Sequence, residues 1–266
     1  MWFPVVAVNG FRRYATYRTA TLAGLFTNTV FGFVIAYVYT ALWDQRPHLG
    51  GYELSQALTF VWLGQALLAA MGLLTGGAFQ EELQERIRTG DVAVDLYRPA
   101  DLQLWWLAAD LGRAVFQLLA RGVAPMVVGA LAFELTLPGE PLRWLAFAVS
   151  VLLALVVSFA LRYLVALTSF WLLDGSGINM LSALAATFFS GMVLPLRAFP
   201  GDLGEAVQVL PWAAVLQVPA DVLMGVRSGA ALPLGLAFQA GWAVALLALG
   251  RLVQGLATRK VVVQGG

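Results

Sequence analysis

Residues 143–166 read RWLAFAVSVLLALVVSFALRYLVA, and no charged side chain lies between Arg143 and Arg162. A run of about 18 or more apolar residues is what an α-helix needs to cross a bilayer. Helices of soluble proteins rarely contain such a run, because they present a polar face to water. This segment therefore predicts a membrane-spanning helix, and the rest of the chain is interpreted outward from it.

The composition of the whole chain agrees with a membrane protein. Hydrophobic residues make up 60% of the 266 positions and charged residues only 12%, whereas a typical soluble domain has about 25% charged residues. There is no cysteine, which excludes disulfide and thiolate chemistry, and the single histidine, His48, excludes any site that needs two. We expect no metal site, and the net charge of +1 gives no reason to expect a nucleic-acid partner.

Further apolar runs on both sides of this segment predict an all-α, polytopic membrane protein with about six transmembrane helices. We expect one membrane domain, residues 1–266. At its start, Arg12, Arg13 and Arg18 alternate with aromatic residues, which predicts an amphipathic helix in the membrane interface. The expected spans are residues 21–43, 55–76, 105–137, 143–170, 178–196 and 231–253.

The basic residues favour one orientation in the membrane, because cytoplasmic loops carry an excess of Lys and Arg. If the N-terminus is cytoplasmic, most of the 16 basic residues lie inside or at the inner interface. An even number of spans then places both termini in the cytoplasm, and we expect a multi-pass protein of a bacterial inner or plasma membrane. The basic residues left outside are Arg46, Arg143, Arg197 and Arg227.

A polar segment between the second and third spans, residues 79–89, predicts a helix of about three turns. Its spacing favours ion pairs between Glu82 and Arg86 and between Glu85 and Arg88. Two interpretations remain open: an amphipathic helix that rests on the membrane surface, or a helix that docks onto a cytosolic partner. An apolar stripe runs along the helix and consists of Phe79, Leu83 and Ile87.

The segment before the last span, residues 200–219, has an apolar core, residues 206–218, that is interrupted by Pro211. A helix of about 13 residues is too short for a hydrocarbon layer about 30 Å thick. A re-entrant pair of short helices on the outer side, with Pro211 at the turn, would keep the backbone groups hydrogen-bonded. The alternative is an irregular extracellular loop with an apolar patch.

Several ionisable residues lie near the predicted spans. We expect nearly all of them at span ends, where their side chains reach the interface, and Asp110 could pair with Arg113 or Arg162 between helices. Glycines within the spans predict close helix packing. The ionisable residues are Asp110, Arg113, Arg121, Glu134, Arg162 and Asp174, and the glycines are Gly24, Gly32, Gly64 and Gly72.

Catalytic motifs are missing from the sequence. The phosphate-binding pattern GxxxxGK[ST] needs a lysine, and the only lysine, Lys260, is followed by Val261. Ser176 lies between two glycines, as in part of an intramembrane serine protease motif, but no histidine lies at membrane depth to activate it. We therefore expect no catalytic residues and no ATP hydrolysis by this chain.

This organisation resembles the type-2 ABC exporter permeases, in particular a multidrug-exporter-like branch. The closest likeness is in residues 87–92, IRTGDV, and residues 96–99, LYRP. The resemblance implies that residues 79–89 are a coupling helix that docks onto a separate ABC ATPase subunit. It also implies that ATP and Mg²⁺ are bound by that subunit and that two permeases, the same or related, work together. The implied coupling residues are Phe79, Glu81, Glu82, Leu83, Glu85, Arg86 and Ile87.

The spans offer few polar groups to a hydrophilic solute, which favours efflux of hydrophobic or amphipathic compounds. Aromatic side chains could contact a flat, apolar or cationic molecule, or could face only lipid and neighbouring helices. An ion- or proton-coupled secondary transporter is the alternative, but the expected deep acidic residue is missing; a membrane enzyme is a third class. The aromatic candidates for the substrate path are Phe26, Phe31, Phe33, Tyr37 and Phe60.

Overall fold

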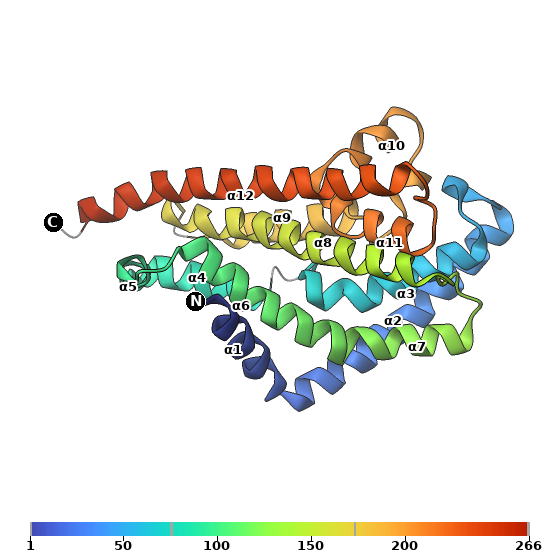
Figure 1. Ribbon diagram of the computed structural model, residues 1–266, viewed down its shortest axis with the longest axis horizontal. Helices are drawn as coiled ribbons and strands as arrows, with labels where there is room; N and C mark the ends of the chain where they lie inside the picture. The colour runs from blue at the N-terminus through green and yellow to red at the C-terminus, as the bar shows by residue number, and fades with distance from the viewer. Residues whose placement is uncertain (1, 75–76, 173, 265–266) are drawn as a thin grey trace.

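The computed structural model describes residues 2–74, 77–172 and 174–264, and every regular element within these residues is a helix. The all-α prediction is therefore confirmed (Figure 1). The longer helices are α1 (Phe3–Ala15), α2 (Arg18–Gln45), α3 (Leu54–Met71), α4 (Ala78–Thr89), α5 (Val92–Tyr97), α6 (Leu102–Gln117), α7 (Val123–Ala132), α8 (Pro141–Leu167), α9 (Ser176–Phe189), α10 (Gly201–Gln208), α11 (Gln217–Leu223) and α12 (Ala231–Gln264). Shorter helical turns are η1 (Leu49–Gly51), η2 (Leu118–Gly122), η3 (Thr168–Phe170), η4 (Leu196–Ala198) and η5 (Pro211–Ala214).

Five helical segments are long and apolar enough to cross a membrane, and they coincide with five of the predicted spans. The third is a continuous rod of α6, η2 and α7, which ends before residue 137 because the backbone becomes extended at Phe133. Residues 75 and 76, the predicted end of the second span, lie outside the described residues. The segments are Arg18–Gln45, Leu54–Met71, Leu102–Ala132, Pro141–Phe170 and Ala231–Arg259.

The segment predicted to span at residues 178–196 is shorter than expected. Its helix, α9, has 14 residues, which rise only about 21 Å. Gly191 then adopts a left-handed backbone with φ of 93°, and Pro195 follows, so the helix cannot continue. Among the described residues, the number of long spans is therefore five, or six if the bent pair of helices before α12 counts as one span.

The Pro-interrupted segment before α12 forms two short arms, Gly201–Gln208 and Pro211–Leu223, bent by 64°. Arg197 precedes the first arm and Arg227 follows the second, and both form ion pairs with Asp221, at 3.1 and 3.4 Å. The segment thus enters and leaves at the same end of the bundle. The structure therefore shows a bent helix pair with Pro211 at the bend, and its position in the membrane as a re-entrant pair stays a prediction.

The helix α3 lies at the centre of the bundle, because 72% of its apolar window is buried, against 44% or less for the other long helices. Its Trp62 side chain fills a space that two glycines leave open. A Cβ atom on Gly32 of α2 or on Gly129 of α7 would lie 2.6 or 2.4 Å from the indole ring. The prediction of close packing at glycine is therefore confirmed at Gly32.

The N-terminal helix α1 packs tightly across α6. A Cβ atom on Gly10 would lie 2.4 Å from the carbonyl oxygen of Ala109, and one on Gly112 would lie 1.9 Å from the carbonyl oxygen of Ala7. Both chain ends lie toward the end of the bundle that carries α4 and α5, whereas α10 lies at the opposite end (Figure 1). We call the first of these the α4 end.

Candidate functional site

The predicted loop helix, residues 79–89, is α4, and its two ends are defined by glycine. Gly77 and Gly90 both adopt positive φ, of 80° and 84°, before and after the helix. The N–H of Gly90 donates to the carbonyl of Ile87, which ends the helix in the usual left-handed manner. The two glycines therefore determine where α4 begins and where it ends.

The inner face of α4 is anchored in the protein. Phe79 and Leu83 are 4% and 0% exposed, and the Phe79 ring lies 5.0 Å from that of Phe159 in α8. The guanidinium of Arg162 lies 4.8 Å above the Phe79 ring, within cation–π distance. The predicted apolar stripe therefore holds the helix against the bundle, with Phe79 and Leu83 away from the surface.

A polar contact ties α4 to α9 as well. Gln80 and Gln84 each donate to the side-chain oxygen of Asn179 at 2.9 Å, and the Asn179 amide donates back to Gln84 at 2.9 Å. These amides are buried or half-buried, so the bonds hold one orientation of the two helices. A displacement of α4 would therefore also move α9.

The ion pairs of α4 differ in part from the sequence prediction. Glu85 and Arg88 pair at 2.5 Å as predicted, but Glu82 pairs with Arg13 of α1 at 2.7 Å. Arg86 donates to Asp95 of α5 from Nε at 2.5 Å and from Nη2 at 3.0 Å. The predicted pair of Glu82 and Arg86 is wrong, because a bidentate partner in α5 and a basic residue in α1 compete for the two side chains.

These hydrogen bonds also stabilise the charged forms of the two arginines. The bond to Glu82 raises the pKa of Arg13, and the bond to Asp95 raises the pKa of Arg86. The α4 helix is therefore joined to α1, α5, α8 and α9. What remains free on its outer side is Glu81, which has no partner among the described residues, and the exposed pair of Glu85 and Arg88.

Two residues of α5 extend this exposed face. Val94 is 59% exposed and Tyr97 is 91% exposed. Tyr97 belongs to the motif that carries the family resemblance, but it was not predicted as a coupling residue. Aromatic side chains are enriched in the centre of protein interfaces. An aromatic residue in a short polar loop could therefore have indicated a contact with a partner protein.

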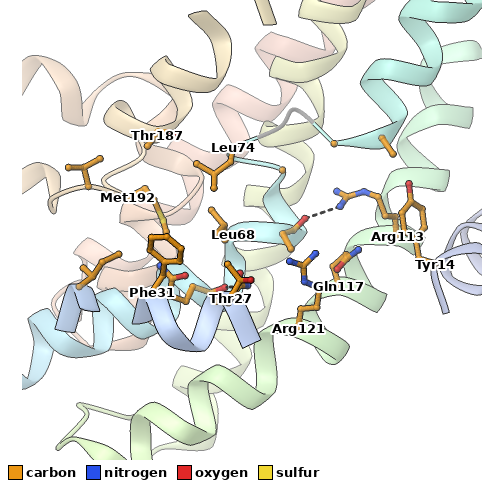
Figure 2. A pocket seen from close by; sticks show the side chains of 18 of the residues that line it. Tyr14, Thr27, Phe31, Leu68, Leu74, Arg113, Gln117, Arg121, Thr187 and Met192 are labelled. Atoms are coloured by element: carbon orange, nitrogen blue, oxygen red, sulfur yellow. Dashed lines mark hydrogen bonds between the residues drawn. The ribbon is translucent and has the colours of Figure 1, made fainter. Parts of the chain in front are cut away.

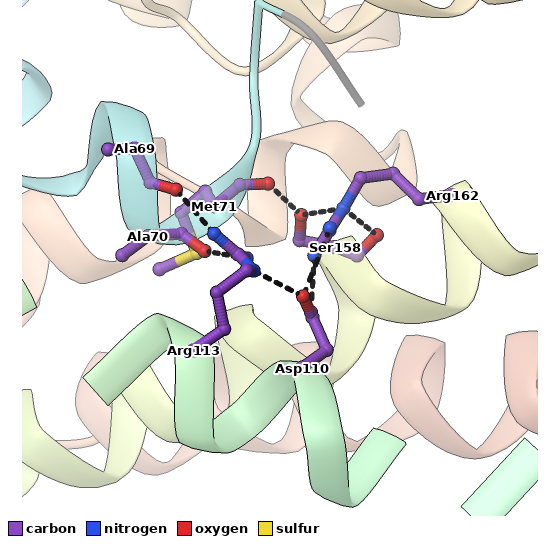
Figure 3. A network of polar contacts seen from close by, with 7 residues as sticks. All are labelled: Ala69, Ala70, Met71, Asp110, Arg113, Ser158 and Arg162. Carbon is purple, nitrogen blue, oxygen red and sulfur yellow. Dashed lines mark hydrogen bonds and ion pairs between the residues drawn. The ribbon is translucent and has the colours of Figure 1, made fainter. Parts of the chain in front are cut away.

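A buried ionic cluster joins α6 and α8 (Figure 3), and its Arg162 is the residue that lies over Phe79 of α4. Asp110 accepts hydrogen bonds from Arg113 Nε at 2.6 Å and from Arg162 Nη2 at 2.7 Å. The three side chains are at most 5% exposed. The expectation that they reach the interface is wrong, because neighbouring helices surround them. The pairing of Asp110 with both arginines, considered from the sequence, is confirmed.

The same cluster completes the end of α3. Arg113 donates to the carbonyls of Ala69 and Ala70 at 2.9 and 2.8 Å, and the Ser158 hydroxyl donates to the carbonyl of Met71 at 2.5 Å. The last carbonyls of a helix lack intrahelical partners, so these donors satisfy them. The cluster therefore joins α3, α6 and α8 directly beneath Phe79 of α4.

Comparison with protein families identifies the class of this molecule. The model of a family described as "ABC-2 family transporter protein" matches residues 26–265. The chain belongs to the ABC-2 transporter family. It is a multi-pass membrane permease domain of an ABC transporter, it has no ATPase activity of its own, and such a subunit works with an ATPase partner. No curated protein matches the chain.

The permease contains a large cavity between α2, α3, η2 and the segment after α9, with a volume of about 680 Å³ (Figure 2). Of the five aromatic residues predicted for a substrate path, only Phe31 lines it. Phe60 is 2% exposed in the core, Phe33 packs edge-on against Trp62, and Phe26 and Tyr37 are 72% and 64% exposed.

A second buried polar cluster lies at the end of the permease opposite α4. Asp221 of α11 is 0% exposed, accepts from the hydroxyl of Tyr52 and pairs with Arg197 at 3.1 Å. Burial, followed by the charge of Asp221, raises the pKa of Tyr52, so its hydroxyl stays a donor. Gln217 donates to Tyr52 at 2.6 Å and accepts from the Leu196 N–H at 2.7 Å. This cluster was not predicted from the sequence, although Asp221 lies within an apolar segment.

Among the described residues there is no group of three or more His, Asp and Glu side chains that could hold a metal ion. Ser176 begins α9, and its backbone N–H donates to Asp174 at 2.9 Å. This hydrogen bond lowers the pKa of Asp174.

Proposed function

We propose that this permease is the membrane subunit of an ATP-driven exporter of hydrophobic or amphipathic compounds, of the multidrug type. Two permeases, the same or related, and two ABC ATPase subunits form the transporter, and the ATPase subunits bind ATP and Mg²⁺. The α4 end faces the cytoplasm, with both termini, in a bacterial cell membrane. The excess of Arg at this end supports that orientation.

The position of α4 carries the proposal. Its outer face, with Glu81 and Glu85, is exposed together with Tyr97 of α5. Its inner face meets the ionic cluster through Phe79 and Arg162, at 4.8 Å. The contacts between α4, the ionic cluster and α3, α6 and α8 are closely packed. Because packed interiors transmit strain, a displacement of α4 by an ATPase subunit also moves these helices.

Gradient-driven transport has less support from the structure. A proton-coupled transporter needs a membrane-embedded carboxylate that binds and releases a proton. The two buried carboxylates described above, Asp110 and Asp221, are each already paired with two arginines, at distances of 2.6–3.4 Å. This arrangement favours transport driven by ATP hydrolysis in a partner subunit over proton coupling through a carboxylate of this chain.

The test compares charge reversal at the two ends of the permease. Glu81→Lys with Glu85→Lys changes only exposed side chains, so the permease is expected to fold and reach the membrane normally. We expect co-purification with the ATPase subunit, and substrate-stimulated ATP hydrolysis, to fall at least about tenfold.

The matched control is Glu140→Lys, which is exposed at the opposite end of the bundle, before α8. It should leave both measurements unchanged. A double variant that still binds its ATPase subunit and exports like the unaltered permease would contradict the proposed docking face.

A further inference from the structure

Arg121 lies within the middle third of the rod formed by α6, η2 and α7, Leu102–Ala132, and has no partner there. It forms no ion pair or hydrogen bond with any residue that the structure describes, and its Nε atom is buried. Two other arginines of the long spans, Arg113 and Arg162, share the carboxylate of Asp110. Arg121 is thus an unpaired cation in a region where a charge costs about 2.5–3.5 kcal/mol or more.

The local backbone is built around this side chain. Arg121 lies in η2, a π-helical turn, and such turns are frequent at functional sites because they re-aim side chains. A Cβ atom on Gly24 of α2 would lie only 1.9 Å from Arg121 Nη2, so the guanidinium fills the space above that glycine. The glycine in α2 thus leaves room for the unpaired guanidinium.

The guanidinium lies at one side of the 680 Å³ cavity, and Figure 2 shows Arg121 and Gln117 projecting from the same helix near Tyr14. The Oε1 atom of Gln117 is also buried without a partner. Burial raises the pKa of Tyr14, so its hydroxyl remains protonated and able to donate. This side of the cavity is therefore polar and positively charged, and no Asp or Glu is among the lining residues.

The remaining walls are apolar, with side chains such as Phe31, Leu68 and Met192. A cavity of this size is within the range of small-molecule sites, about 300–1,000 Å³. The lining residues of the cavity favour a molecule that has an anionic group and an apolar body. The planar fork of an arginine matches a carboxylate or a phosphate, and the apolar walls match a hydrocarbon or aromatic body.

We infer that this cavity binds an amphipathic anion, with its carboxylate or phosphate paired to Arg121 and its apolar body against Phe31, Leu68 and Met192. A lipophilic cation is disfavoured, since it would meet the unpaired charge of Arg121. As a statement about the exported compound, the inference rests on the proposed export function. As a statement about binding, it stands on the cavity alone.

The test uses the purified permease without an ATPase subunit, in nanodiscs of phosphatidylcholine. The probe is dansylaminoundecanoic acid, and its methyl ester is the matched uncharged probe; both are titrated by fluorescence. We expect the acid to bind roughly 10- to 100-fold more tightly than the ester, the range that a charge-assisted hydrogen bond supplies. Arg121→Gln should remove this difference, and Arg121→Lys should keep part of it.

Two controls separate the site from general effects. Arg12→Gln removes the same charge from an exposed position on α1 outside the cavity and should bind both probes like the unaltered permease. Arg121→Gln should be at least as heat-stable as the unaltered permease in neutral lipid, because it removes an unpaired charge. Equal affinity for acid and ester, or acid binding unchanged by Arg121→Gln, would overturn the inference.

The source of the anion is resolved in a second lipid. If phosphatidylglycerol in the nanodisc displaces the acid from the unaltered permease, the natural occupant is an anionic membrane lipid; if it does not, the occupant is a separate amphiphile. Either result requires the site at Arg121. Failure of probe binding would refute the site alone, since ATP-driven export is tested separately by the loss of ATPase association in the Glu81 and Glu85 variant.

Discussion

At the scale of single residues, Asp110 has the largest expected effect on stability. It is the carboxylate that Arg113 and Arg162 share in a buried environment. Breaking a buried ion pair leaves an uncompensated charge, at a cost of about 3–5 kcal/mol. We predict that Asp110→Ala lowers the unfolding free energy of the detergent-solubilised permease by about 3–5 kcal/mol, measured by denaturant unfolding.

Asp44→Ala is the matched control for this variant, because Asp44 is exposed at the end of α2 and forms no ion pair with any residue that the structure describes. We expect its stability to change by less than about 0.5 kcal/mol. Equal unfolding free energies of the two variants would mean that the buried ion pairs of Asp110 do not stabilise the fold.

The sequence revealed the pairing of Asp110 but not its environment. The spacing of Asp110 and Arg113 is that of neighbours on one helix face, so their contact could be predicted. Whether that face meets lipid headgroups or other helices depends on tertiary packing, which no local pattern contains. For the same reason Arg13 and Asp95, the actual partners of Glu82 and Arg86, could not be found from spacing within α4.

At the scale of elements, a bidentate ion pair between Arg86 and Asp95 links α4 to α5, beside the apolar contact of the two helices. We predict that Arg86→Asp alone reduces substrate-stimulated ATP hydrolysis by about tenfold, because α5 and its Tyr97 then lose their fixed position. The double variant Arg86→Asp with Asp95→Arg should recover most of the activity. Activity that stays low in the double variant would assign Arg86 a direct contact with the ATPase subunit instead.

A second element-scale prediction concerns the packing of α3 between α2 and α7. Gly129→Val places side-chain atoms where the Trp62 indole lies, since even a Cβ atom would come within 2.4 Å of it. We expect a loss of about 1–3 kcal/mol in unfolding free energy. Gly139→Val, in a loop with open space around its Cβ, should unfold like the unaltered permease; a similar loss there would point to a general effect of valine.

The elements themselves were largely predictable. Apolar runs and polar breaks located the long helices, and Pro211 located the bend of the re-entrant pair. The length of α9 was not predictable from hydropathy, because the apolar run continues beyond Phe189, whereas the left-handed backbone of Gly191 and then Pro195 prevent the helix from continuing. The cavity could not be predicted from the sequence either, because its lining residues, such as Phe31 and Arg121, come from separate helices.

At the scale of the whole molecule, the orientation in the membrane is open to a direct test. The permease has no native cysteine, so single cysteines can be introduced without background. We predict that Asp202→Cys, exposed on α10, reacts with an impermeant maleimide in intact cells, and that Thr89→Cys, exposed at the end of α4, reacts only after lysis. The reverse labelling pattern would invert the topology and move the α4 end outside.

The central claim is that the face formed by α4 and α5 docks onto an ATPase subunit. The most direct measurement places the photo-crosslinker p-benzoylphenylalanine at Tyr97, which is 91% exposed, or at Leu142, which is 71% exposed at the start of α8. The permease is irradiated in its native membrane and its adducts are identified by mass spectrometry. The account predicts an adduct with an ABC ATPase subunit from Tyr97 and none from Leu142. No ATPase adduct from Tyr97, or one from Leu142 only, would contradict it.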